Sequence, residues 1–307
     1  MWERDTEFIR CPRCGGSLEL DMFVEGDEIR EGVLSCMACR LEFPIIDGIP
    51  IVWDDIAEYF ARRAALGGRL YRIAQSPKMG MFVKEALSSA AASARTSAAK
   101  GAAAAYDRTN LENRWSRIYR RSEGSEFYHV IKERLARLPS GRRVLEHGCS
   151  VGTVSNHLAS PDSGPAYEAV VGIDSSYDAI AQAKGAGADA CYAVGDSTSC
   201  ITGGLRFDLV VALNMLELIE PLELIRHMSS QTLPGAYVAM ADPYDFERGP
   251  GPVPRRIDEH SLRAALTEHG FEISADTAEP SYIPWRLEIN PRTVLNYKVD
   301  LVIGART

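Results

Sequence analysis

Four cysteines near the N-terminus have the spacing of a metal site. They form two Cys-x-x-Cys pairs, Cys11 with Cys14 and Cys36 with Cys39. Two residues between thiolates let both sulfur atoms reach one ion from a tight turn, and two such pairs complete a tetrahedral S₄ site that suits Zn²⁺. Because four thiolates leave no open coordination position, we expect a structural zinc. A redox dithiol is the alternative, and the second pair argues against it.

A second set of polar residues follows apolar, β-branched runs further along the chain. Three runs end in an acid and a fourth ends in an amide, namely Glu146, Asp174, Asp196 and Asn214. Helical segments between such runs indicate βαβ units and a parallel sheet. Ligands of parallel sheets bind outside the carboxyl ends of the strands, so we expect these side chains to share one site.

Small residues follow the first of these runs at alternate positions. Gly148, Ser150 and Gly152 precede a helix that we predict from about residue 153 to 158. A Cβ at such positions would hold a ligand away from the backbone, and the helix N-terminus offers free N–H groups. A nicotinamide-binding sheet also places an acid on a ribose. Against that alternative, its third-glycine pattern is missing and no hydride-transfer residues are apparent.

Together these motifs resemble the class I S-adenosylmethionine-dependent methyltransferases over roughly residues 145–307. The first motif of that family reads acid-x-Gly-x-Gly-x-Gly, and Ser150 stands here in place of the middle glycine. The resemblance implies an α/β fold with a Rossmann-like seven-stranded sheet. It also implies that the last strand, near residues 297–303, is antiparallel and lies beside the fifth.

The same resemblance implies a site for S-adenosylmethionine as methyl donor. Asp174 would accept both ribose hydroxyls, and Asp196 would accept the adenine amino group with the Ser197 N–H beside it. The expected donor-binding residues are Glu146, Gly148, Ser150, Gly152, Asp174, Ser175, Asp196, Ser197 and Asn214.

The segment after the second cysteine pair carries another resemblance. Residues 44–50 read Pro-Ile-Ile-Asp-Gly-Ile-Pro, a phrase that is similar to the Trm112-like family over about residues 10–53. Those small zinc proteins are partners that stabilise methyltransferases. The resemblance implies that such a partner is fused here to its enzyme, with a structural or substrate-docking role.

We therefore predict a chain of three parts. They are a Trm112-like zinc ribbon at 1–55, an Ala-rich helical connector or lid at 56–108, and a class I methyltransferase domain at 109–307. Helical spacing over 56–70 is interrupted by Gly67 and Gly68, where we expect a break. The Ala-rich stretch 79–105 has few large apolar residues to anchor it, so a connector, a mobile lid and a disordered segment all remain open.

Charge is distributed unevenly along the chain. Residues 1–60 contain 5 Lys/Arg against 14 Asp/Glu, residues 61–134 contain 15 against 6, and residues 135–307 contain 14 against 22. The basic middle either packs against the acidic ends or forms a phosphate-binding stripe for RNA. Its cations are spread among alanines rather than clustered with aromatic residues, which favours the first alternative.

Neither a membrane span nor a secretion signal is evident. The sequence has no run of 18 apolar residues, and Met1 to Asp5 do not open a signal peptide. Seven cysteines, an odd number, indicate reduced thiols. We therefore expect a cytoplasmic protein without a membrane partner.

Methyl transfer needs a nucleophile held in position in a site that excludes water. In this family the acceptor-binding residues follow the fifth strand, which we predict at 235–241. Asp242, Tyr244 and Glu288 are candidates to position the acceptor or take its proton, and Trp285 could form an apolar or cation–π wall. Ordinary loop packing is the alternative for all four.

The Pro-Tyr turn at 243–244 and the Pro-Trp segment at 284–285 resemble methyltransferases of small histidine-derived metabolites. We therefore predict methyl transfer to a small molecule, with an amine or imidazole nitrogen as acceptor. One alternative is methylation of a base in ribosomal or transfer RNA. Another is a scaffold that binds the donor without catalysis.

Overall fold

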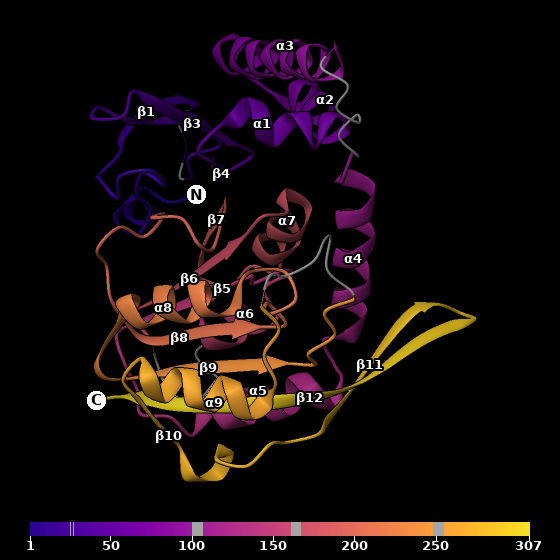
Figure 1. Cartoon of the computed structure of the whole chain (residues 1–307). Coiled ribbons are helices and arrows are strands. Elements are labelled where there is room, and N and C mark those ends of the chain that lie inside the picture. The colour runs from indigo at the N-terminus through magenta and orange to yellow at the C-terminus, as the bar shows by residue number, and fades with distance from the viewer. Residues whose placement is uncertain (25, 27, 100–106, 161–166, 248–254) are drawn as a thin grey trace.

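The structure is a computed structural model that describes residues 1–24, 26, 28–99, 107–160, 167–247 and 255–307. Its centre is a twelve-stranded sheet with helices against both faces (Figure 1). Within the described residues, no helix has the length and apolar composition needed to cross a bilayer.

The parallel core consists of β5 (Arg143–His147), β6 (Ala169–Asp174), β7 (Cys191–Gly195), β8 (Phe207–Leu213) and β9 (Thr232–Asp242). β12 (Thr293–Arg306) is antiparallel and lies between β9 and β10 (Phe271–Ile273). The strand order is β7-β6-β5-β8-β9-β12-β10. This arrangement confirms the predicted seven-stranded methyltransferase sheet with its antiparallel last strand.

Alternating residues of the core strands face opposite layers of helices, as the two-residue period of a strand requires. Leu145 and Val210 belong to the cluster that includes α8 (Pro221–Gln231) and α9 (Glu259–Glu268). Val144 and Leu209 belong to the cluster that includes α4 (Thr109–Ser122) and α5 (Glu126–Ala136). The connections also include α6 (Ser155–Leu158), α7 (Tyr177–Gly185) and the short helix η3 (Ala275–Thr277).

The N-terminal part adds four strands to the same sheet. After η1 (Glu3–Glu7), an antiparallel meander runs through β1 (Glu19–Val24), β2 (Glu31–Cys36), β3 (Leu41–Ile46) and β4 (Ile49–Val52). β4 then pairs in parallel with β7, with Ile51 opposite Val194 and Val52 opposite Gly195. The carboxyl ends of β4 and β7 therefore lie side by side, an arrangement that the sequence did not indicate.

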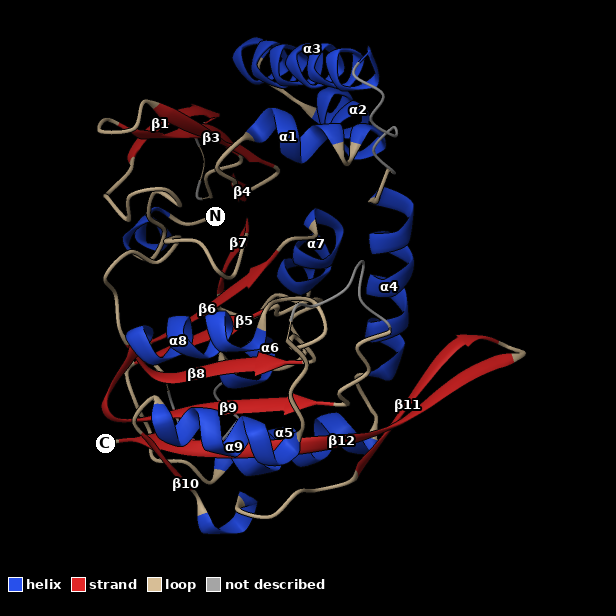
Figure 2. Cartoon of the chain, viewed as in Figure 1, coloured by secondary structure: helices blue, strands red, loops and turns tan. Residues whose placement is uncertain are grey.

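The connector contains α1 (Ile56–Ala61), α2 (Ala64–Ile73) and α3 (Pro77–Ala99), shown in blue in Figure 2. The break predicted at Gly67 and Gly68 is wrong, because both glycines lie inside α2 and the chain turns at Arg62 and Arg63 instead. A Cβ on Gly67 would stand 2.6 Å from the Leu87 side chain. That glycine therefore permits close packing of α2 on α3. The Ala-rich stretch is helical as far as residue 99, and its remainder lies outside the described residues.

Residues 283–290 form a strand, β11 (Ile283–Asn290), that the sequence pattern did not indicate. Proline within a run argues against a central strand, yet Pro284 is tolerated here because β11 pairs only with β12. The β11–β12 hairpin projects from the side of the sheet (Figure 1).

Candidate functional site

The carboxyl edge of the parallel strands gathers most of the predicted site residues. Asp174 ends β6, Asp196 follows β7 and Asn214 follows β8. Ser150, Asn214 and Tyr244 adopt left-handed φ values of 49°, 57° and 55° at this edge. Such conformations cost energy in residues other than glycine and cluster at ligand-binding sites. Three such residues at one edge of the sheet indicate a functional site there.

Asp174 is held by backbone groups. Its Oδ2 accepts the Ser150 N–H at 2.9 Å, and its Oδ1 accepts the Ser176 N–H at 2.8 Å. Burial raises the pKa of Asp174 to about 6, although these two N–H groups favour its charged form. A carboxylate oxygen has two lone pairs, so each oxygen can accept one further hydrogen bond. Ser175, the next residue, uses its carbonyl oxygen to accept the Tyr59 hydroxyl at 3.2 Å.

Glu146 is a brace between β5 and α6. Its Oε2 accepts the Ser155 N–H at 2.8 Å and also the Ser155 hydroxyl. Burial raises the pKa of Glu146 to about 7. The side chain thus fixes the start of α6 against the end of β5, and its contact with a donor stays a prediction.

The glycines of the first motif permit close approach of protein atoms. Gly148 and Gly152 have φ values of +62° and +75°. A Cβ on Gly148 would stand 2.0 Å from the Met215 sulfur, and one on Gly152 would stand 2.7 Å from the Ala183 Cβ. Both glycines are required by local packing in this structure, whatever they contribute to a ligand.

Asn214 carries an unsatisfied group. Its backbone N–H donates to the Ala241 carbonyl at 2.7 Å, but its side-chain Oδ1 is buried and has no hydrogen-bond donor among the described residues. Leaving a buried polar atom unpaired costs about 1–3 kcal/mol. The amide oxygen therefore keeps an unused position for accepting a hydrogen bond.

Asp196 borders a cavity of about 310 Å³ that sequence reasoning missed. Its Oδ1 accepts the Thr198 N–H and the Thr198 hydroxyl, each at 2.8 Å, while Ser197 beside it is buried. The other lining residues come from the N-terminal domain and the connector: Trp53, Glu58, Tyr59, Arg62, Arg63 and Arg108. The pairing of β4 with β7 brings Trp53 to this edge, and the hydrogen bond from Tyr59 to Ser175 holds the connector there; no local motif signals either contact.

The structure brings Asp242 and Tyr244 together, in a network of protein contacts. Asp242 accepts the Leu216 N–H at 3.0 Å and the Tyr244 N–H at 2.7 Å, and burial raises its pKa. The Tyr244 hydroxyl donates to Asp300 at 2.9 Å, and Asp300 pairs with Arg263 at 2.7 Å. Their predicted acceptor-positioning roles stay predictions.

Trp285 and Glu288 both lie on β11. The Trp285 ring centroid is 5.8 Å from that of Tyr297, whose hydroxyl donates to Asp245 at 2.9 Å, next to Tyr244. Trp285 is buried, with ring centroids of Phe127 and Tyr119 at 5.0 and 6.0 Å. Glu288 is exposed and pairs with Val294, six residues before Asp300 on β12. Six residues of strand span about 20 Å. The structure therefore does not bring Glu288 to the end of β9.

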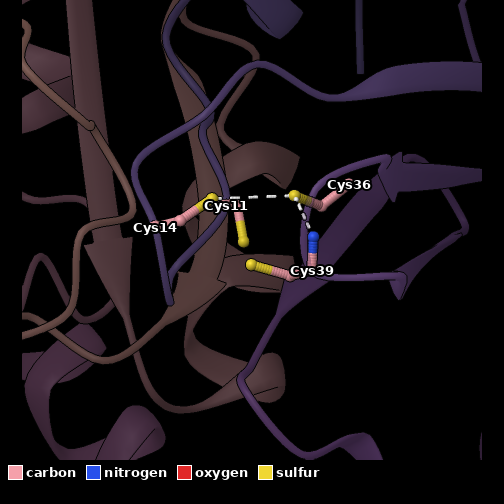
Figure 3. A group of neighbouring side chains, drawn as sticks. All are labelled: Cys11, Cys14, Cys36 and Cys39. Atoms are coloured by element: carbon pink, nitrogen blue, oxygen red, sulfur yellow. Dashed lines mark hydrogen bonds between the residues drawn. The ribbon is translucent and has the colours of Figure 1, made fainter.

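The four N-terminal cysteines converge in space (Figure 3). Their sulfur atoms all lie within 4.8 Å of one another, and those of Cys14 and Cys36 are 3.7 Å apart. A tetrahedral Zn²⁺ with bonds of about 2.3 Å would place its sulfur ligands about 3.8 Å apart. Donor set and geometry therefore fit one four-coordinate ion.

Two family models match the chain. The model of a methyltransferase domain matches residues 119–275, and the model of Trm112p-like proteins matches residues 6–48. The UPF0434 protein HEAR2489 of Herminiimonas arsenicoxydans is 37% identical over 65 residues, which cover 21% of this chain and 98% of that protein.

Solved structures share the fold. A chain in the complex between the Haloferax volcanii Trm112 methyltransferase activator and the putative methyltransferase is 17% identical, with a TM-score of 0.50; the match covers 62% of this chain and 94% of that one. Magnesium protoporphyrin IX methyltransferase of Synechocystis with bound SAH is 18% identical, with a TM-score of 0.44, over 63% and 93%. Because the methyltransferase model spans half of the sequence, the chain belongs to the methyltransferase domain family, as an S-adenosylmethionine-dependent methyltransferase with an N-terminal Trm112-like domain.

Proposed function

We propose that this enzyme binds S-adenosylmethionine along the carboxyl edge of β7, β6, β5 and β8 and methylates a small-molecule acceptor. The observation that carries the proposal is the set of hydrogen-bond acceptors at that edge. Asp196, Asp174 and Asn214 lie on it, and the buried Asn214 Oδ1 has no donor among the described residues. A bound donor would supply an electrophilic methyl group on its sulfonium.

Each of these residues has a role that its surroundings support. Asp174, with both oxygens oriented by backbone N–H groups, accepts the two ribose hydroxyls. Asp196, oriented by Thr198, accepts the amino group of the adenine. Asn214 accepts a hydrogen bond from an N–H group of the donor or the acceptor. Because the protein fixes these side chains before binding, little ordering remains to be done when the ligand enters.

The ion pairs of the basic segment, residues 61–134, support a small acceptor. At least seven of its cations form ion pairs with carboxylates: Arg62, Arg63, Arg69, Lys78, Arg108, Arg120 and Arg134. Partners such as Asp21, Asp178 and Asp276 belong to the acidic ends. An RNA-binding stripe uses its cations to replace counterions on phosphates. Cations already neutralised within the chain favour the intramolecular interpretation.

The fused N-terminal domain takes the place of a separate stabilising partner. Its strand β4 extends the methyltransferase sheet through β7, and we propose that one Zn²⁺ on Cys11, Cys14, Cys36 and Cys39 maintains its fold. The metal has a structural role because its four thiolates leave no open position.

Methyl-group labelling tests the choice of acceptor. Purified enzyme receives S-adenosylmethionine labelled in the methyl group, together with a metabolite extract or total RNA. We expect label in the small-molecule fraction, and Asp174→Ala should abolish it. Label in RNA, with RNA binding that weakens steeply as salt rises, would contradict the small-acceptor proposal.

A further inference from the structure

We propose that the N-terminal domain and the first connector helix form one wall of the donor site, in which Trp53 packs against the adenosine half of S-adenosylmethionine and the buried Tyr59 and Arg63 hold Trp53 in place. This inference rests on the proposed donor binding at the carboxyl edge. It gives the Trm112-like domain a direct part in ligand binding, in addition to stabilising the enzyme.

The sheet register places Trp53 at the carboxyl edge. β4 and β7 are parallel, and Val52 lies opposite Gly195. The next residues, Trp53 and Asp196, therefore leave two neighbouring strands at the same edge, and such strands are about 4.8 Å apart. Trp53 is thus a residue of the carboxyl edge, even though it belongs to the N-terminal domain. Trp53 and Asp196 line the same cavity.

The connector places a second aromatic ring beside Trp53. α1 begins after Asp55, whose side chain accepts the Glu58 N–H at 3.0 Å. This helix brings Tyr59 to the loop after β6, where its hydroxyl donates to the Ser175 carbonyl at 3.2 Å. The rings of Trp53 and Tyr59 have centroids 5.3 Å apart. An aromatic wall therefore runs from the end of β4 to the residue that follows Asp174.

Arg63 fixes this wall in place. Its side chain is 1% exposed, and its guanidinium makes two hydrogen bonds to Glu112, at 2.9 and 2.7 Å. The guanidinium lies 4.2 Å from the centroid of the Tyr59 ring and 5.8 Å from that of Trp53. A bidentate Arg–carboxylate pair is rigid, and a cation over an aromatic face attracts it. The rings are thus held before any ligand arrives.

The lining of the cavity matches a purine better than a phosphate. Arg62 and Arg108 also line it, but they pair with Glu58 at 2.8 Å and with Glu112 at 3.4 Å. Neutralised cations attract an anion weakly. Aromatic rings offer a flat apolar surface to the face of a base, and a carboxylate accepts hydrogen bonds from an exocyclic amino group.

The zinc knuckle supports both sides of the cavity. Arg13, between the first two cysteines, pairs with Asp54 at 2.9 and 3.0 Å, next to the tryptophan of the wall. The carbonyl of Pro12 accepts the Cys200 N–H at 3.0 Å, in the loop that follows β7 and contains Asp196. Hydrogen bonds therefore link the cysteine knuckle to the segments on both sides of the cavity.

The test measures binding rather than turnover. S-adenosylhomocysteine and 5′-methylthioadenosine are titrated into wild type, Trp53→Ala, Trp53→Phe and the matched control Trp2→Phe. We expect Trp53→Ala to weaken both ligands about tenfold, the loss of one base–aromatic contact. Trp53→Phe should retain most of the affinity while losing the ligand-induced quenching of tryptophan fluorescence, and Trp2→Phe should keep that quenching.

The control variant Asp174→Ala distinguishes failure of the proposed donor site from failure of the proposed wall. If Asp174→Ala loses binding while folded Trp53→Ala binds both ligands as wild type does, the wall is refuted and the proposed donor site stands. If neither substitution changes affinity, the donor site itself is misplaced and the inference falls with it. Circular dichroism of each variant checks folding, and unchanged quenching in Trp53→Phe would likewise overturn the role of Trp53.

Discussion

The two ends of the carboxyl edge use their polar residues differently. At the β4–β7–β6 end, Asp196 and Trp53 border a cavity of about 310 Å³. At the β9–β12 end, Tyr244, Asp300 and Arg263 satisfy one another in a buried network. Polar groups at the first end can still form hydrogen bonds with a ligand. At the second end, many of these groups already bond to one another and hold the strands and α9 together.

The polar network at the β9–β12 end has a structural role. Arg263 makes two hydrogen bonds to Asp300, and Ser281 donates its N–H to the same carboxylate at 2.7 Å. Burial alone would raise the pKa of Asp300, but the hydrogen bonds from Arg263, Ser281 and Tyr244, together with the charge of Arg263, outweigh it and lower that pKa below its ordinary value. A buried acidic residue such as Asp300 can therefore be fully occupied by hydrogen bonds within the protein, which argues against a role in ligand binding.

Metal removal should have the largest effect, and it should act at the β4–β7–β6 end. We expect wild type to contain one zinc per chain and the double variant Cys11→Ser/Cys14→Ser to contain none. The N-terminal domain should then lose folding free energy on the order of 10 kcal/mol, as zinc-dependent modules do. Metal analysis and thermal unfolding measure this, and fully folded metal-free wild type would contradict the zinc site.

Disrupting the Arg263–Asp300 network should lower stability without weakening donor binding. Asp300→Ala leaves Arg263 buried without its carboxylate, which we expect to lower the free energy of unfolding by about 3–5 kcal/mol. Urea unfolding measures the loss. Affinity for S-adenosylhomocysteine should stay within the error of wild type at a temperature where the variant is folded. A selective loss of affinity would show that the two ends are coupled.

Donor affinity should depend on pH through Asp174. Burial and the nearby Glu112 raise the pKa of Asp174 to about 6, and the two backbone N–H groups and Arg63 oppose that shift. Only the charged carboxylate accepts from both ribose hydroxyls, so affinity should be constant above that pKa and fall as pH decreases through it. Each pH unit below the pKa costs about 1.4 kcal/mol. Asp174→Asn should bind weakly at every pH, without this slope.

The smallest effect is expected for Tyr244→Phe, which tests whether Tyr244 has a structural or a catalytic role. Tyr244→Phe removes the hydroxyl that donates to Asp300, and we expect it to cost about 1 kcal/mol of stability. The rate of methyl transfer should fall only slightly, as it should for Glu288→Gln on the distant hairpin. A loss of several thousandfold in kcat for Tyr244→Phe, with an altered pH profile, would make this tyrosine an acid–base residue.

The sequence allowed the core of the sheet and the clustering of the four N-terminal cysteines to be predicted. Apolar runs that end in Asp174 and Asn214 indicate both the length of the strands and the edge where polar groups follow them. The paired cysteines have the spacing that one ion needs. Such features are local, so a single chain segment contains the signal.

Features that depend on distant partners could not be predicted. Trp53 reaches the edge because β4 pairs with β7, some 140 residues later in the chain. Tyr244 is occupied by Asp300, 56 residues away. Gly67 looked like a helix break because its packing partner, Leu87, lies on another helix. In each case the local pattern was consistent with several outcomes, and a long-range contact selected one.

Calorimetric titration of S-adenosylmethionine into wild type and Asp174→Ala measures whether Asp174 holds the donor. We expect one binding site per chain, and a loss of about 2–4 kcal/mol in binding free energy when the carboxylate and its hydrogen bonds are removed. Circular dichroism should show that the variant is folded. Unchanged affinity in folded Asp174→Ala would contradict the assignment of the carboxyl edge as the donor site.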